Sequence, residues 1–265
     1  MMNKLITGFF MAWGNFLTLP CPYKKWNNDL KDMMLSFLPS VGAVAGMVWM
    51  MLLWILRLAA IPVPLSAFLM MLCIFGICGF MHLDGFMDCA DAILSRRPLE
   101  ERQRILKDSN VGAFAVAAAI FLMIGWYASM SSAYETLSYG VIFLIPVMSR
   151  TWGGMFVLSF KPIGHSQYAS DYERPGRGKN RAALIIEAVI YILFVMAVGG
   201  DPMQVIVTIL VETAAALIAG GCAIKQLGGM SGDIAGHIIC WCEAAAVAAL
   251  AVMASTASTV GIISI

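Results

Sequence analysis

The feature that most constrains this chain is a series of seven long apolar stretches. A membrane-spanning helix needs about 20 mostly apolar residues, because the hydrocarbon core is about 30 Å thick and a helix rises about 1.5 Å per residue. Such stretches occupy residues 33–57, 62–82, 111–130, 137–160, 182–199, 203–224 and 235–256. They are continuous rather than alternating, which favours helices over the strands of a membrane barrel. The sequence therefore predicts an all-α, polytopic integral membrane helical bundle.

The composition supports this prediction. Of the 265 residues, 60% are hydrophobic and 12% are charged, which is about half the charged share of a soluble domain. So few charges cannot cover a water-exposed surface, which excludes a soluble enzyme and a disordered chain. Because no repeat or separate soluble segment interrupts the spans, we expect a single membrane-embedded domain over residues 1–265. Its surroundings are the lipid bilayer; we expect no nucleic-acid partner, and a homo-oligomer remains open.

A further apolar run lies at residues 5–20. It is interrupted by Gly8, Asn15 and Thr18, so we expect an interfacial or re-entrant helix rather than another full span. It follows the single basic residue Lys4 and lacks an A-x-A cleavage site, which argues against a secretory signal peptide.

The basic residues indicate the orientation. Fifteen of the seventeen Lys and Arg residues lie in the segments 1–32, 83–110, 161–181 and 225–233. None lies in the alternate connections 58–61, 131–136 and 200–202. Because basic loops stay in the cytoplasm, we expect a multi-pass protein of the cell inner membrane whose large loops, and any active site, are at the cytoplasmic face.

An acidic cluster is the most informative motif. In the stretch 81–91, Asp84, Asp88 and Asp91 are spaced i, i+4 and i+7, so they lie within about 60° of one another on one face of a helix. Three like charges repel, and a divalent cation would remove that repulsion. Hard oxygen ligands suit Mg²⁺, or Mn²⁺, better than zinc. A solvated helix end at the headgroup layer is the alternative interpretation.

Two neighbours of this cluster allow two interpretations each. Asp108, in the stretch Asp108–Gly112, could complete the metal site from a second helix or act as the N-cap of that helix. His82 could be a ligand or a structural hydrogen-bonding residue.

Basic and glycine-rich segments provide a second candidate set. Arg150 lies inside an apolar span, where a charge is costly and is either functional or paired with an acid. The loop 161–181 carries Lys161, Arg174, Arg177 and Arg181 among glycines, and such loops suit phosphate groups, although a loop that only fixes topology has the same composition.

The segment 228–233, Gly-Gly-Met-Ser-Gly-Asp, precedes the last span. Its small residues let backbone amides approach a ligand or another helix, with Asp233 as a candidate ligand. A glycine turn with a helix cap has the same sequence. Glu187, Glu212 and Glu243 lie inside apolar spans and mark either an ion path or interhelical hydrogen bonds.

These motifs resemble the cobalamin synthase family, the adenosylcobinamide-GDP ribazoletransferases. The resemblance rests on His82-x-Asp84-Gly85-x-x-Asp88-x-x-Asp91 and on Asp108-Ser109-x-x-Gly112. It extends to Phe16-Leu17-Thr18-x-Pro20, to Leu38-Pro39-x-Val41-Gly42 and to Gly228-Gly229-x-Ser231-Gly232-Asp233-x-x-Gly236. Ala92, Ala115 and Ser231 depart from the residues that are common in the family.

The resemblance implies a reaction of late cobalamin biosynthesis, in which the nucleotide loop is assembled. The substrates would be adenosylcobinamide-GDP and α-ribazole or its 5′-phosphate. The ribose 3′-hydroxyl would attack the cobinamide-side phosphate and GMP would leave, with magnesium required.

These considerations assign roles to the candidate residues. The expected metal ligands are Asp84, Asp88, Asp91 and Asp108, and Asp91 or Asp108 would accept the hydroxyl proton. The expected substrate-binding residues are His82, Gly85, Arg150, Lys161, Arg174, Arg177, Arg181, Ser231 and Asp233.

Two other functions are weighed against this one. A CDP-alcohol phosphotransferase would continue D-G-x-x-A-R, but Asp88 and Cys89 stand where that pattern has Ala and Arg. A cation transporter would place its polar residues at mid-membrane on paired or broken helices, whereas the predicted carboxylates gather at one face.

Overall fold

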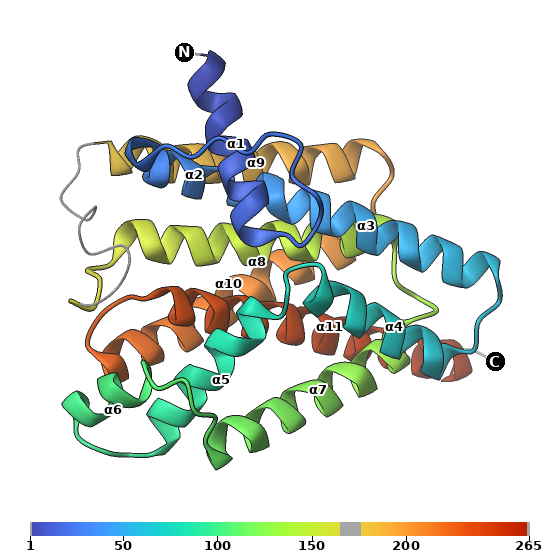
Figure 1. The fold of residues 1–265 in the computed structure, drawn as a ribbon. Coiled ribbons are helices and arrows are strands. Elements are labelled where there is room, and N and C mark those ends of the chain that lie inside the picture. Colours follow the sequence, from blue (N-terminus) through green and yellow to red (C-terminus); the bar gives the residue numbers. More distant parts are fainter. Residues whose placement is uncertain (1, 165–175, 264–265) are drawn as a thin grey trace.

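The computed structural model describes residues 2–164 and 176–263. These residues form eleven α-helices and one short 3-10 helix (Figure 1). The helices are α1 (Met2–Phe16), α2 (Lys31–Ser36), α3 (Leu38–Leu58), α4 (Val63–Gly76), α5 (Met81–Leu94), α6 (Leu99–Ile105), α7 (Ala113–Ala133), α8 (Tyr139–Ser159), α9 (Arg177–Ala197), α10 (Pro202–Leu227) and α11 (Gly232–Ile263). The 3-10 helix, η1, covers Asn28–Leu30. The all-α prediction is confirmed.

Six helices are long and apolar enough to cross a membrane, namely α3, α7, α8, α9, α10 and α11. The helices α4 and α5 pass the same test only as a bent pair, and the number of spans is seven if this pair counts as one. A multi-pass membrane protein is therefore the architecture, as the hydropathy pattern predicts.

The second span differs from the expected uninterrupted helix over 62–82. It breaks after Gly76, bends by 86° and resumes as α5 at Met81. Gly79 and Phe80 both adopt a positive φ of 59°, a left-handed conformation that no α-helix contains. We call residues 77–80 the elbow. The acidic cluster consequently lies along the second helix of a bent pair and not at the end of one continuous helix.

The other boundaries follow from local capping signals. Asp201 begins α10 by accepting hydrogen bonds from the N–H groups of Met203 and Gln204 at 2.9 and 3.3 Å, as an N-cap does. Pro202 follows in the first helical turn, and Gly228 ends the helix with a φ of 78°, where glycine is favoured.

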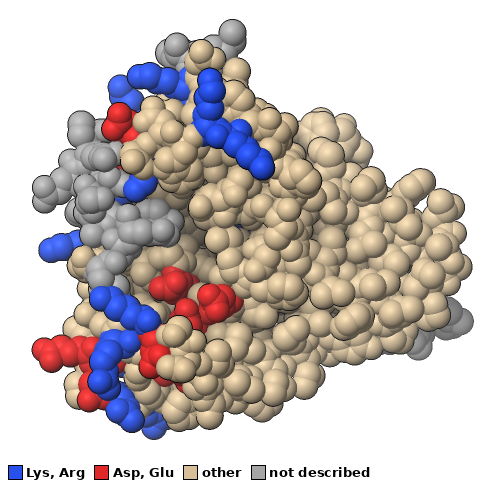
Figure 2. Space-filling view, in the orientation of Figure 1, with Lys and Arg blue, Asp and Glu red and all other residues tan. Residues whose placement is uncertain are grey.

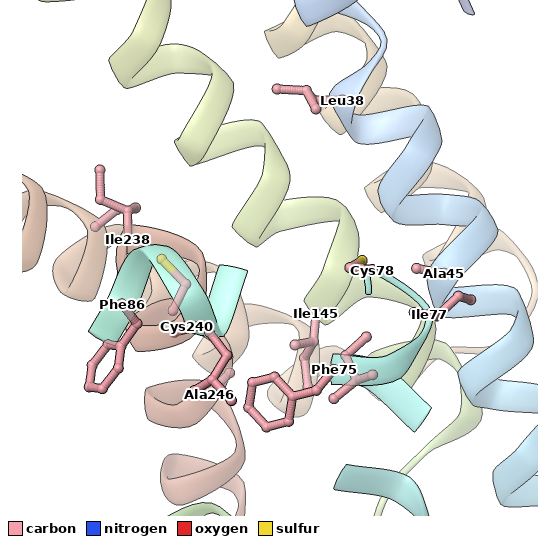
Figure 3. Packing of buried hydrophobic residues seen from close by; sticks show 14 of the residues in the cluster. Leu38, Ala45, Phe75, Ile77, Cys78, Phe86, Ile145, Ile238, Cys240 and Ala246 are labelled. Atoms are coloured by element: carbon pink, nitrogen blue, oxygen red, sulfur yellow. The ribbon is translucent and has the colours of Figure 1, made fainter. Parts of the chain in front are cut away.

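Helix α8 lies at the centre of the bundle. Almost all of its residues are buried, and it contacts α3, α9, α10 and α11. On α3, Gly42 and Gly46 face the α8 backbone at Pro146 and Phe143 so closely that a Cβ at either glycine would overlap a carbonyl oxygen. Small residues spaced four apart allow this kind of close approach between membrane helices. Figure 3 shows side chains from α3, α5, α8, α11 and the elbow meeting in the core.

The N-terminal helix α1 runs crosswise to α3 and α8 (Figure 1). It has 15 residues, which is shorter than a span, so its interfacial or re-entrant position stays a prediction. The chain that follows α1 returns to the bundle and forms hydrogen bonds with the elbow through Thr18.

Candidate active site

Charged side chains gather at one end of the molecule. Figure 2 shows Lys, Arg, Asp and Glu at this end of the face in view, whereas the opposite end is bare of charge. Several acidic side chains lie recessed in a hollow, with basic side chains around them. We call this region the acidic hollow and describe below the residues that build it.

Helix α5 carries three of the acids. Asp84 is exposed, and Asp88 and Asp91 are partly exposed. Asp88 experiences the negative charges of Asp84, Asp91 and also Asp233. The predicted shared face of the three α5 acids therefore exists, and a fourth carboxylate joins it from α11.

Two glycines bring Asp233 to this position. A Cβ at Gly85 would lie 2.7 Å from the Asp233 carbonyl oxygen, and a Cβ at Gly236 would lie 2.9 Å from the His82 carbonyl oxygen. Only glycine permits α5 and α11 to approach this closely. Gly85 thus contributes a helix contact to the site.

Asp91 lies at the N-terminus of α7. Its Oδ1 accepts a hydrogen bond from the Ala115 N–H at 3.2 Å, and a Cβ at Gly112 would overlap its carboxylate. The first turn of a helix has unpaired N–H groups and a partial positive charge. The first turn of α7 therefore fixes the position of the Asp91 carboxylate.

Asp108 lies in the loop between α6 and α7. The N-cap interpretation is wrong, because the N-cap of α7 is Gly112. The Oδ1 of Asp108 accepts hydrogen bonds from the Asn110 backbone N–H at 3.0 Å and from its side-chain amide at 2.7 Å. These bonds lower the pKa of Asp108 below its ordinary value. Asp108 and Asp91 line one cavity of about 450 Å³, together with Ser95, Arg97 and Asn110.

The two predicted loop motifs meet. Residues 161–163 pair with Met230: the Met230 N–H donates to the Lys161 carbonyl at 2.8 Å, and the Ile163 N–H donates to the Met230 carbonyl at 2.9 Å. Gly229 fits there because a Cβ would lie 2.9 Å from the Ile163 nitrogen. The pairing places the exposed Lys161 beside Met230, which directly precedes Ser231 in the chain.

Ser231 connects this turn to α11. Its Oγ accepts a hydrogen bond from the Ile234 N–H at 3.3 Å and donates one to the Asp233 Oδ2 at 3.2 Å. The first bond is that of an N-cap. The glycine-turn interpretation and the site interpretation of this motif are therefore compatible.

The structure places Arg150 in the buried core. It is 1% exposed and forms an ion pair with Glu243. Its guanidinium also donates to Ser149 Oγ at 2.9 Å and to Cys78 Sγ at 3.2 Å. The pairing alternative of the sequence analysis thus describes Arg150, whose guanidinium is engaged inside the protein.

The remaining predicted residues are dispersed. Arg177 is buried and pairs with Asp32 of α2 at 3.5 Å. Arg181 is exposed on α9, and Arg174 lies outside the described residues. The imidazole Nε2 of His82 is buried and makes no hydrogen bond among the described residues.

The donor chemistry of the hollow fits a hard divalent cation. The carboxylates that act on one another are Asp84, Asp88, Asp91 and Asp233, and all their donors are oxygen atoms, as Mg²⁺ and Mn²⁺ prefer. Among the described residues no three His, Cys, Asp or Glu side chains form a preassembled metal site. Magnesium is usually held by one or two carboxylates, with water and substrate phosphates as its other ligands, so a preassembled cage is not required.

Comparison with known proteins identifies the family. The model of the cobalamin-5-phosphate synthase family matches residues 8–251. The chain belongs to this family. It is therefore an enzyme, a transferase of cobalamin biosynthesis, and the resemblance inferred from the motifs is confirmed.

Relatives in this cobalamin-5-phosphate synthase family cover nearly the whole chain. An adenosylcobinamide-GDP ribazoletransferase from Clostridium botulinum (strain Alaska E43 / Type E3) is 35% identical over 240 residues, 89% of this chain and 93% of the relative. One from Clostridium perfringens (strain SM101 / Type A) is 32% identical, over 86% and 91%. One from Brevibacillus brevis is 28% identical, over 88% and 93%. No solved structure matches the chain.

Three contributors to this family member's site were missed in the sequence. Arg97 lines the cavity of Asp91 and Asp108; its signal was a basic residue six positions after Asp91. Asn110 holds Asp108, and its signal was an amide two residues after a carboxylate, which is typical of a turn. Thr18 was noted as an interruption of an apolar run and as part of the motif Phe16-Leu17-Thr18-x-Pro20, but no role was assigned to it.

Proposed function

We propose that this enzyme joins α-ribazole, or its 5′-phosphate, to adenosylcobinamide-GDP and releases GMP. The observation that carries this proposal is the gathering of α5 and α11 carboxylates in one hollow that basic side chains surround. A diphosphate needs both a dication to offset the carboxylates and cationic groups to bind its oxygens. The substrates are proposed from the relatives, which are adenosylcobinamide-GDP ribazoletransferases.

The proposed reaction is a phosphoryl-type displacement. The ribose 3′-hydroxyl of α-ribazole attacks the phosphorus next to cobinamide, and a new P–O bond forms. The bond from that phosphorus to the oxygen bridging the diphosphate breaks, and GMP leaves with the bridging oxygen. The hydroxyl proton passes to a carboxylate of the protein.

We propose Asp84, Asp88, Asp91 and Asp108, with Asp233, as the carboxylates available to hold Mg²⁺ or Mn²⁺. The ion, when bound, orients the diphosphate and stabilises charge on the leaving oxygen. Asp84, Asp88 and Asp233 supply one group of oxygens from the close contact of α5 with α11. Asp91 and Asp108 supply a second group, because both line the same cavity.

We assign the proton to Asp91. Asn110 donates two hydrogen bonds to the Asp108 carboxylate, which lower its pKa below its ordinary value and make it a poor proton acceptor. Asp91 accepts a single backbone bond through Oδ1 and faces the same cavity.

Basic residues near the hollow bind the phosphates in this proposal. Arg97 lines the cavity, and Lys161 is exposed beside the turn that carries Ser231. Arg181 and Arg174 remain candidates from the same loop region. The active site faces the cytoplasm, because the basic loops are expected on that side.

The test uses the purified full-length protein in detergent or vesicles. Adenosylcobinamide-GDP, Mg²⁺ and either α-ribazole or its 5′-phosphate are supplied, and GMP release is measured. We expect GMP release by the wild type, its loss with EDTA and its recovery with Mg²⁺ or Mn²⁺. Asp84→Asn and Asp88→Asn should each lower the rate by about 100-fold or more.

Asp29→Asn serves as the matched control, because Asp29 is an exposed carboxylate on η1, remote in the chain from the acidic motif. It should leave the rate unchanged. Normal turnover by Asp88→Asn would show that the Asp88 carboxylate is not needed for the reaction. A wild type that releases no GMP with either acceptor would refute the proposed reaction.

A further inference from the structure

The elbow between α4 and α5 sets the direction of the acidic helix. Gly79 and Phe80 both have a φ of 59°, and a non-glycine residue in this conformation stores strain that its surroundings must offset. The Asp84 N–H donates to the Phe80 carbonyl at 2.9 Å. The backbone of the residue that carries the first carboxylate is thus hydrogen-bonded directly to the end of the elbow.

Thr18 holds the elbow from outside the bundle core. Its backbone N–H donates to the Ile77 carbonyl at 2.9 Å, and its hydroxyl lies 3.1 Å from the same oxygen and 3.3 Å from the Gly76 carbonyl. These carbonyl groups lie at the C-terminal end of α4, where a helix has no intrahelical N–H groups to pair with them. A Cβ at Gly79 would lie 3.1 Å from the Thr18 methyl carbon, so Thr18 also packs on the strained residue.

Arg150 holds the elbow from inside. Its guanidinium donates to Cys78 Sγ at 3.2 Å, and Cys78 is 4% exposed. The same guanidinium pairs with Glu243 of α11, and Ser149 Oγ donates to Glu243 at 3.1 Å. Figure 3 shows the Cys78 side chain directed into the core at the elbow. One buried cation therefore joins α8, the elbow and the helix that carries Asp233.

We infer that Thr18 and Arg150 are positioning residues for the transfer reaction: clamped between them, the elbow fixes the direction of α5 and so the place of Asp84 and Asp88 relative to Asp233. The inference rests on the proposed function, because it assigns a purpose to the geometry of the same carboxylates. Both residues act through the elbow. The inference also explains why a threonine of the N-terminal segment and an arginine of a membrane-spanning helix both contact the elbow.

The first test compares Thr18→Val with Thr18→Ser. Valine keeps the shape of threonine but removes the hydroxyl bonds to the Ile77 and Gly76 carbonyls, whereas serine keeps the hydroxyl. We expect Thr18→Val to lower kcat about 10-fold with a smaller change in KM, and to weaken Mn²⁺ binding, measured by the EPR signal of free Mn²⁺, by a similar factor. Thr18→Ser should stay within about 3-fold of the wild type in both measurements.

Thr7→Val is the matched control. Its hydroxyl bonds only to the Asn3 carbonyl within α1, at 2.8 Å, so the same chemical change is made away from the elbow. It should leave kcat and Mn²⁺ binding unchanged. Equal behaviour of Thr18→Val and Thr18→Ser in both measurements would overturn the outer half of the inference.

The second test removes the buried cation without leaving a buried charge. Arg150→Met alone strands Glu243 and is expected to impair folding, so the informative protein is the double variant Arg150→Met with Glu243→Met. Replacing both members of a buried ion pair with apolar side chains often preserves stability. We expect this protein to fold, as shown by an unchanged thermal unfolding midpoint, but to lose at least about 10-fold in kcat and in Mn²⁺ affinity. Wild-type kcat and Mn²⁺ affinity in a folded double variant would overturn the inner half.

The two readouts separate this inference from the proposed function. If the wild type binds Mn²⁺, Thr18→Val and the double variant weaken that binding and no GMP is released, the reaction assignment fails and the positioning inference stands. If GMP is released and neither variant alters kcat or Mn²⁺ binding, the reaction assignment stands and the positioning inference fails.

Discussion

At the scale of single residues, Gly112 shows how a missing side chain serves a carboxylate. A Cβ at this position would occupy the space of the Asp91 carboxylate. The φ of Gly112 is −86°, which alanine also adopts. The glycine is therefore needed for space and not for backbone conformation.

Gly112→Ala should accordingly displace Asp91. We expect the rate of GMP release to fall by about 100-fold, since a catalytic group misplaced by about 1 Å costs roughly that much. Gly125→Ala on the same helix has nothing within 4 Å of its Cβ and should keep full activity. Equal rates in the two variants would show that the position of Asp91 does not limit the reaction.

For two buried glutamates, we expect substitution by glutamine to have opposite effects on the free energy of unfolding. Glu243 pairs with Arg150, whereas both carboxylate oxygens of Glu212 are buried and make no hydrogen bond among the described residues. Glu243→Gln weakens a buried ion pair and should cost about 3–5 kcal/mol of unfolding free energy, the typical cost of removing one partner. Glu212→Gln removes no ion pair and should leave the thermal unfolding midpoint unchanged or raised.

Thermal unfolding in a single detergent measures both variants against the wild type. If Glu212→Gln destabilised the protein as much as Glu243→Gln, Glu212 would have a partner that the hydrogen-bond pattern does not include.

At the scale of helices, the contact between α5 and α11 brings Asp233 to the α5 acids. Gly85→Ala would place a Cβ 2.7 Å from the Asp233 carbonyl oxygen and 2.8 Å from its Cα, and both are backbone atoms that can move only with the helix. We expect a loss of about 1–3 kcal/mol from overpacking, and a larger relative loss of activity because Asp233 shifts.

Gly221→Ala provides the comparison, because nothing lies within 4 Å of its Cβ. Alanine favours a helix over glycine by about 0.5–1 kcal/mol, so this variant should be as stable as the wild type or more stable. Thermal unfolding and GMP release are measured in parallel. A Gly85→Ala protein with wild-type values in both would show that α5 and α11 tolerate a wider spacing.

Most helices of the bundle could be predicted from the sequence, because bilayer thickness imposes their length and apolar character. The break in the second span could not. Ile77, Cys78 and Phe80 are apolar, and hydropathy does not detect a positive φ; Gly76 and Gly79 were the only local signals. The predicted span 33–57 likewise joined residues 33–36 of α2 to α3, because hydropathy does not detect the break at Phe37.

The site was predictable where its residues share one helix, and less so where they meet across the fold. The spacing of Asp84, Asp88 and Asp91 fixes their common face. No spacing rule predicts that Arg150 pairs with a glutamate 93 residues away. Nor does any local pattern predict that Met230 pairs with Lys161 and Ile163.

At the scale of the whole molecule, the distribution of charged side chains agrees with the orientation that the basic loops predict. The end opposite the hollow includes the turn between α7 and α8, where Arg57 donates to the Leu137 carbonyl at 3.0 Å and to the Tyr134 carbonyl. A cationic residue is thus held by carbonyl groups of a short turn. The exposed basic residues Arg96, Arg97, Lys107 and Lys161 lie at the charged end, which is the end expected in the cytoplasm.

Labelling with a membrane-impermeant maleimide tests this orientation. Lys107 is exposed in the loop before α7 and Glu135 is exposed in the turn after it. Lys107→Cys should be labelled in inverted vesicles and protected in right-side-out cells, and Glu135→Cys should show the reverse pattern. The wild type supplies the background from native cysteines such as the exposed Cys222. Labelling of Lys107→Cys from outside would reverse the assigned orientation.

The bend between α4 and α5 places the carboxylates at one end of the bundle and leaves the rest of the bundle closely packed. Helix α5 starts near the middle of the bundle (Figure 1), so the carboxylates sit in a recess open at the charged end, while α8 and its neighbours fill the rest with close packing. A polar ligand that enters this recess would reach the carboxylates without passing between the closely packed helices.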